Sequence, residues 1–200
     1  GHGDATGAGC DNITDYSSFI LDFMHTLDIK NPVVCGLSMG GAIVQDLLIR
    51  HGSEFSAGIL MNTGPFLSVS ETIFNAVRKR YSAYVNMLVS FCTSETSDRE
   101  KLDGVIRQMS QCKQKVACLD FEACNNFNVT QDLKKIKTPV LIMGGHDDKI
   151  TPPALSKMLH DLITGSEMEM LIDTGHLPCI EKPEKSAVII SDYLKRIKNR

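Results

Sequence analysis

The sequence lacks any apolar run long enough to cross a bilayer and any long block of like charges. A membrane-spanning helix needs about 20 consecutive apolar residues, so no membrane association is expected. The 21 Lys and Arg residues nearly balance the 24 Asp and Glu residues, which gives a formal net charge of −3. Nucleic acid is therefore not an expected partner either, because its recognition requires a basic surface.

The seven cysteines include no CxxC pair, the spacing typical of zinc and redox motifs. Cys112, Cys118 and Cys124 recur every six residues, but six helical steps rotate a side chain by about 240°, so the three would not share a helix face. We therefore expect reduced thiols, a cytoplasmic protein, no metal site and no cofactor.

Apolar residues follow two alternating spacings along the chain. Short apolar runs typical of buried strands occur at 32–35, 57–61, 139–143 and 168–172. Three- and four-residue apolar spacing, typical of amphipathic helices, occurs at 16–27, 39–50, 153–162 and 183–198. The second of these helices is expected to stop at Gly52 in the left-handed conformation. The pattern indicates an α/β fold with a mostly parallel sheet flanked by helices.

The middle of the chain has helical periodicity and no strand pattern. We therefore divide the chain into a first core part at 1–66, a helical lid at 67–128 and a second core part at 129–200. An all-helical insertion in an α/β core is typical of a lid over an active site. The aromatic residues in and next to the lid are candidates for substrate contact, although packing within the lid is the more common role of such residues: Phe66, Phe74, Tyr81 and Tyr84.

The motif Gly36-Leu37-Ser38-Met39-Gly40 lies between a predicted strand and a predicted helix. A G-x-S-x-G sequence in this context is typical of a sharp turn that exposes a nucleophilic serine. The N–H group of Met39 would then lie at the helix N-terminus, where it can donate to an oxyanion. The alternative is an ordinary glycine-rich turn with a serine that caps the helix.

A serine nucleophile needs a histidine base and a carboxylate that orients the base. His146, Asp147 and Asp148 follow one predicted strand, and His176 follows the last one. The carboxyl ends of parallel strands meet at one edge of a sheet, so all these residues are expected near Ser38. The order Ser, Asp, His fits a hydrolase with a nucleophile elbow, but it leaves both aspartates and both histidines as candidates.

Four stretches of the chain resemble the α/β-hydrolase superfamily: GHG at 1–3, GLSMGG at 36–41, PVLIMGGHDDKITPP at 139–153 and GHLPCIEKPE at 175–184. Within the superfamily, these stretches are most similar to those of the enol-lactonases, haloperoxidase-like proteins and small carboxylesterases. In that family the acid precedes a proline by four residues, as Asp148 precedes Pro152. The resemblance thus implies Asp148 as the acid and His176 as the base.

The resemblance also implies a departure from the family. There, GHG ends the fourth strand, whereas this chain begins on that motif. We therefore expect the N-terminal strands, and one oxyanion-hole amide with them, to be absent from these 200 residues. Either an upstream segment supplies them, or the exposed strand edge pairs with another copy in a homo-oligomer.

Together, these patterns and the resemblance predict that the protein is a hydrolase of carboxylic esters. The expected substrate is a small, mostly apolar ester, lactone or thioester, cleaved through an acyl-enzyme by a Ser-His-Asp triad. Ser38 would be the nucleophile, His176 the base and Asp148 its orienting acid. The alternative is a non-catalytic or ligand-sensing α/β-hydrolase-like domain, or a truncated fragment.

Overall fold

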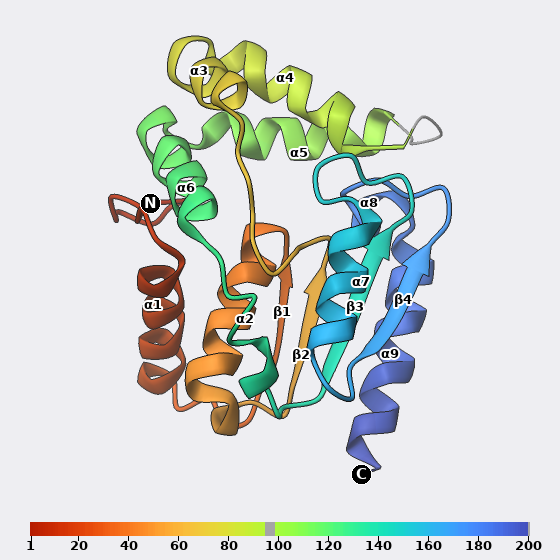
Figure 1. Cartoon of the computed structure of the whole chain (residues 1–200). Coiled ribbons are helices and arrows are strands. Elements are labelled where there is room, and N and C mark those ends of the chain that lie inside the picture. Colours follow the sequence, from red (N-terminus) through yellow and green to blue (C-terminus); the bar gives the residue numbers. More distant parts are fainter. Residues whose placement is uncertain (95–98, 200) are drawn as a thin grey trace.

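Four parallel strands form one sheet, in the order β1-β2-β3-β4, in the computed structural model, which describes residues 1–94 and 99–199 (Figure 1). Val33 pairs with Ala57, Gly58 with Val140, and Leu141 with Glu167. The described residues place no strand against the outer edge of β1, as the sequence led us to expect. The strands are β1 (Val33–Leu37), β2 (Ala57–Met61), β3 (Val140–Gly145) and β4 (Glu167–Leu171).

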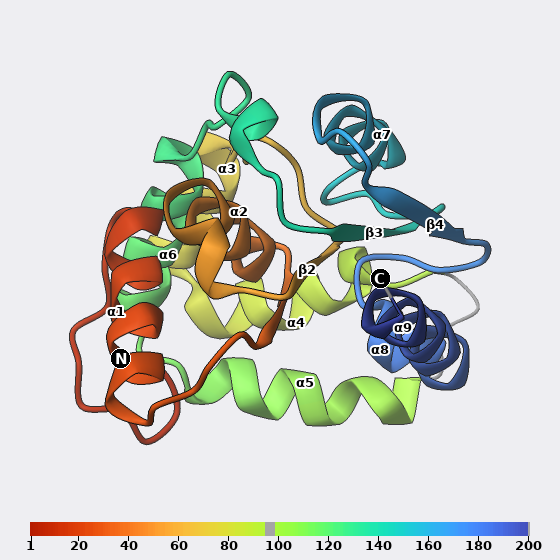
Figure 2. The same cartoon turned by 90° about the horizontal axis from the view of Figure 1, so that it is seen from below.

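Helices cover both faces of the sheet, which confirms the predicted α/β class (Figure 2). Leu60 and Ile142 pack against helices α2 and α7, while Ile59 and Leu141 point to the opposite face and helix α9. Each such buried side chain contributes about 1.5–3 kcal/mol to folding. The helices of these two layers are α1 (Ile13–Thr26), α2 (Met39–His51), α7 (Pro153–Leu162), α8 (Pro178–Glu181) and α9 (Pro183–Lys198).

A separate helical layer lies over the carboxyl ends of the strands (Figure 1). Its helices pack around a small apolar core of their own that includes Val77, Tyr84, Val85 and Ala117. An antiparallel bridge between Phe66 and Asn128 joins the two ends of this segment. We refer to the layer as the lid helices: α3 (Glu71–Lys79), α4 (Tyr81–Cys92), α5 (Arg99–Gln111) and α6 (Gln114–Asn126).

Some element ends differ from the predicted ones. Gly52 has φ −53°, so the expected left-handed helix end is wrong, and the chain continues into a 3₁₀ turn at Gly52–Glu54. A Cβ atom at this position would lie 2.9 Å from the hydroxyl of Thr138, so a larger residue would require the Thr138 side chain to shift. Strand β1 also extends beyond the predicted run, because Gly36 continues the ladder opposite Leu60. Within the described ranges, no helix combines the length and apolar character that crossing a bilayer requires.

Candidate active site

Ser38 occupies a sharp turn between β1 and α2. Its backbone is held at φ 53° and ψ −117°, outside the regions that L-residues ordinarily adopt, and its N–H group donates to the carbonyl of Met61 at 2.9 Å. The turn brings Gly36 so close to Gly40 that a Cβ atom at position 36 would lie 2.1 Å from the Gly40 carbonyl oxygen. The first glycine of the motif is therefore a steric requirement of the turn.

Met39 is the first residue of α2. The N–H groups of a helix's first turn have no intrahelical acceptor, and the helix dipole makes this end partly positive. Met39 and Ser38 line the same cavity. The Met39 amide is therefore available to a negatively charged oxygen beside the serine.

His176 and Asp148 form a buried pair at the same edge of the sheet. The imidazole Nδ1 lies 2.8 Å from Oδ2 of Asp148, and the two residues are only 5% and 4% exposed. Asp148 follows β3 and His176 follows β4. The competing candidates, His146 and Asp147, both lie exposed on the loop after β3. Of the two aspartates and two histidines, the structure thus pairs Asp148 with His176 in the interior.

The Asp148 carboxylate is surrounded by hydrogen-bond donors. Oδ1 accepts from the N–H groups of Ile150 at 2.8 Å and Thr151 at 3.0 Å. Oδ2 accepts from the Thr151 hydroxyl and the Asn62 amide, each at 2.6 Å. Burial opposes ionisation of Asp148, but the hydrogen bond and charge of His176, together with the Thr151 donors, outweigh it and lower the pKa of Asp148. The acid is therefore held ionised beside the imidazole.

Two residues that the sequence did not single out hold these loops in place. The Asn62 amide donates both to Asp148 and, at 2.9 Å, to the carbonyl of Gly175, so it links the two loops. The Glu181 carboxylate accepts from the N–H groups of Gly175 and Leu177, on either side of His176. Asn62 directly follows a strand that the sequence predicted, and this position was the available signal for it.

A cavity of about 510 Å³ lies between the sheet edge and the lid helices. Ser38 and His176 line it from the sheet side, and its volume is in the range of small-molecule sites. The lid side is mostly apolar and includes Leu88, Val105, Met109 and Phe121. The arrangement can enclose a small apolar molecule against the serine and the histidine.

The four aromatic candidates for substrate contact separate into two pairs. Tyr81 and Tyr84 line the cavity. The structure places Phe66 and Phe74 outside the cavity wall: Phe66 lies at the base of the lid, and Phe74 is buried in edge-to-face contact with Phe121. Helical spacing identifies an apolar face, but it does not tell which apolar residue meets the cavity and which meets a neighbouring helix.

The sequence is similar to a known protein family and to known enzymes. A family model described as "Serine aminopeptidase, S33" matches residues 1–177. The 3-oxoadipate enol-lactonase 1 of Acinetobacter baylyi is 26% identical over 205 residues, which cover 98% of this chain and 76% of that protein.

Solved structures agree on the fold. The enol-lactonase from Burkholderia xenovorans LB400 is similar with a TM-score of 0.88 and 24% identity, over 97% of this chain and 77% of that one. An esterase from Exiguobacterium antarcticum is similar with a TM-score of 0.92 and 20% identity, over 98% of this chain and 78% of that one. The fold of the chain is thus the fold of these two enzymes.

Proposed function

Because the chain belongs to the serine aminopeptidase S33 family of α/β hydrolases, we propose that it is a serine hydrolase of small, mostly apolar esters, lactones or thioesters. The observation that carries the proposal is the buried pair of His176 and Asp148, whose histidine lines the same cavity as Ser38. The enol-lactonase and the esterase among its relatives make an ester or a lactone the leading substrate class.

The geometry supports a two-step mechanism. The Ser38 hydroxyl attacks the substrate carbonyl while Nε2 of His176 takes the hydroxyl proton, and the resulting oxyanion accepts a hydrogen bond from the Met39 amide. The imidazolium formed at His176 is stabilised by the ionised Asp148. The tetrahedral intermediate collapses, His176 protonates the leaving alcohol or thiol, and a water molecule activated by His176 then releases the acyl group from Ser38.

The cavity wall narrows the substrate class. Most lining side chains are apolar, so they favour an apolar acyl or alcohol group. Tyr84 is 2% exposed, lines the cavity, and has a hydroxyl with no hydrogen-bond partner among the described residues. Burial raises its pKa, so the hydroxyl stays protonated. The hydroxyl itself is not accessible from the cavity, so the Tyr84 ring, and not its hydroxyl, contributes to the apolar wall.

Covalent labelling tests the proposal directly. A fluorophosphonate probe should label the folded protein at Ser38, found by peptide mass spectrometry, and should abolish hydrolysis of a short-chain p-nitrophenyl ester. Ser38→Ala should remove both labelling and turnover. Ser70→Ala, which removes the hydroxyl that caps α3, should leave both unchanged. Absence of labelling in a cooperatively folded protein would instead favour a ligand-sensing domain.

A further inference from the structure

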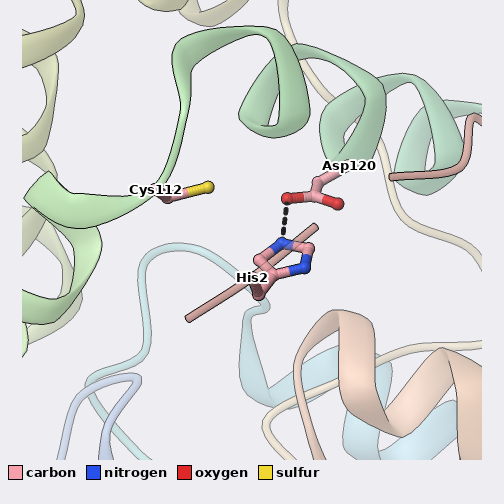
Figure 3. Close-up of side chains that lie close together, drawn as sticks. All are labelled: His2, Cys112 and Asp120. Carbon is pink, nitrogen blue, oxygen red and sulfur yellow. Dashed lines mark hydrogen bonds and ion pairs between the residues drawn. The ribbon is translucent and has the colours of Figure 1, made fainter. Parts of the chain in front are cut away.

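One part of the cavity wall brings together three side chains that commonly ligate metals. His2 comes from the loop before α1, Cys112 directly follows α5, and Asp120 lies in α6. Their ligand atoms all lie within 4.8 Å of one another. In Figure 3 the sulfur of Cys112 and the carboxylate of Asp120 are directed toward the space above the His2 ring. All three residues also line the cavity.

Asp120 is held in place from outside the cluster. Its Oδ1 accepts a hydrogen bond from the hydroxyl of Tyr16 at 2.5 Å, and Tyr16 in turn accepts from the N–H group of Cys10 at 2.9 Å. This leaves Oδ2 facing the imidazole of His2, whose Nε2 lies 2.7 Å away. Outer hydrogen bonds of this kind orient ligating side chains in metal sites.

The donor set of one sulfur, one nitrogen and one oxygen suits Zn²⁺. With zinc–ligand bonds of about 2.0–2.3 Å, tetrahedral ligands lie about 3.3–3.6 Å apart. Closing the observed cluster around an ion thus requires side-chain shifts of about 1 Å, and the half-exposed side chain of His2 has room to move. The ion would replace the proton shared by His2 and Asp120 and would release the thiol proton of Cys112.

We propose that His2, Cys112 and Asp120 form a three-ligand Zn²⁺ site that joins the N-terminal loop to the lid helices. Three protein ligands leave a fourth position of the tetrahedron open. Because the three residues line the cavity, that position is accessible to water or to a ligand bound there. None of the three residues belongs to the proposed triad, so the site does not depend on the proposed hydrolase mechanism.

Cobalt provides a spectroscopic test, because Co²⁺ replaces Zn²⁺ and absorbs by charge transfer when a thiolate binds it. Titration of untagged protein with Co²⁺ should produce this band at one ion per chain, and added Zn²⁺ should abolish it. Cys112→Ser should remove the band, whereas Cys35→Ser, which changes an exposed cysteine elsewhere, should keep it. Zn²⁺ should also raise the melting temperature of the unaltered protein.

Further variants separate a built site from surface binding. Tyr16→Phe leaves all three ligands in place and should weaken Zn²⁺ binding by about 10–100-fold in a calorimetric titration. His2→Gln should weaken it at least as much, while His146→Gln, at an exposed histidine outside the cluster, should have no effect. A band that survives Cys112→Ser, or an affinity unchanged by Tyr16→Phe and His2→Gln, would mean an adventitious ion only and would overturn the proposal.

Discussion

The two walls of the cavity differ in the hydrogen bonding of their polar atoms. On the sheet side, Asp148 receives donors from His176, Asn62, Ile150 and Thr151, so one arrangement of the site is strongly favoured. On the lid side the wall is mostly apolar, and the Tyr84 hydroxyl has no partner within the described part of the chain. Directional bonds fix the first wall, whereas shape and burial define the second.

This difference suggests that one wall serves catalysis and the other serves substrate selection. A wall built from directional bonds can hold reacting groups within the narrow tolerance that catalysis needs. An apolar wall can change its lining without disturbing those bonds, so it is suited to selecting substrates. The walls meet where the N–H group of His176 donates to the carbonyl of Cys92 at the end of α4, at 2.5 Å. Substitutions on the sheet side should therefore affect every substrate, and those on the lid side only some.

The strongest test of the sheet side is Asp148→Asn. An amide cannot hold the imidazole in the tautomer that accepts the serine proton, so ester turnover should fall by about 10⁴-fold for all substrates. Asp147→Asn, on the neighbouring exposed residue, should leave turnover within about twofold, because surface changes away from the site have small effects. Steady-state kinetics with three esters of different chain length would measure both. Equal losses in the two variants would contradict the placement of the acid.

A smaller effect is expected at Thr151, and it should depend on pH. Because the pKa of Asp148 is lowered in the folded protein, its ionised form stabilises the fold above the unfolded-state pKa. This contribution is lost as pH falls through the folded-state pKa. Thr151→Val removes the hydroxyl that donates to the carboxylate, so the free energy of unfolding at pH 7 should fall by about 1.5–3 kcal/mol.

The loss of unfolding free energy caused by Thr151→Val should become smaller as the pH is lowered, until Asp148 is protonated in both the variant and the unaltered protein. Thr138→Val is the matched control, because the Thr138 hydroxyl donates to the uncharged carbonyl of Gly52. Thr138→Val should lower the free energy of unfolding by about 0.5–1.5 kcal/mol, and this loss should not change with pH. Urea unfolding at several pH values measures both. If Thr151→Val lowered the free energy of unfolding by the same amount at every pH, the Thr151 hydroxyl would not act on the ionised form of Asp148.

Much of the sheet side could be predicted from the sequence, because its signals are local. A run of apolar residues followed by a glycine-rich turn places Ser38 and the acid loop at one edge of the sheet. The residue pattern alone left Asp147 and Asp148 open, since only the path of the loop after β3 decides which carboxylate turns inward. The Asn62 amide joins two loops that are distant from it in sequence, and its position after a strand was the available signal for it. Glu181 accepts from the N–H groups of Gly175 and Leu177, six and four residues away, but no motif singles out this carboxylate.

The lid side was less predictable for the same physical reason. Helical periodicity correctly indicated helices, but the partner of each apolar face is set by tertiary packing, so Phe66 and Phe74 could not be told from Tyr81 and Tyr84. The same holds for His2 and Asp120, which meet across 118 positions of the chain. Cysteine spacing within one helix could not reveal a cluster that three separate elements assemble.

The smallest effect is expected for Tyr84→Phe, on the lid side of the cavity. Removing a buried hydroxyl that lacks a partner should leave the fold as stable or raise its free energy of unfolding by about 1 kcal/mol. The ring that lines the cavity is unchanged, so kcat/KM should stay within about twofold for every ester. The hydroxyl of Tyr81 already donates to the carbonyl of Met109, at 2.9 Å. Tyr81→Phe should therefore cost stability without changing the order of substrates. If Tyr84→Phe slowed every ester alike, the lid side would be part of the catalytic geometry, and the proposed division between the two walls would be wrong.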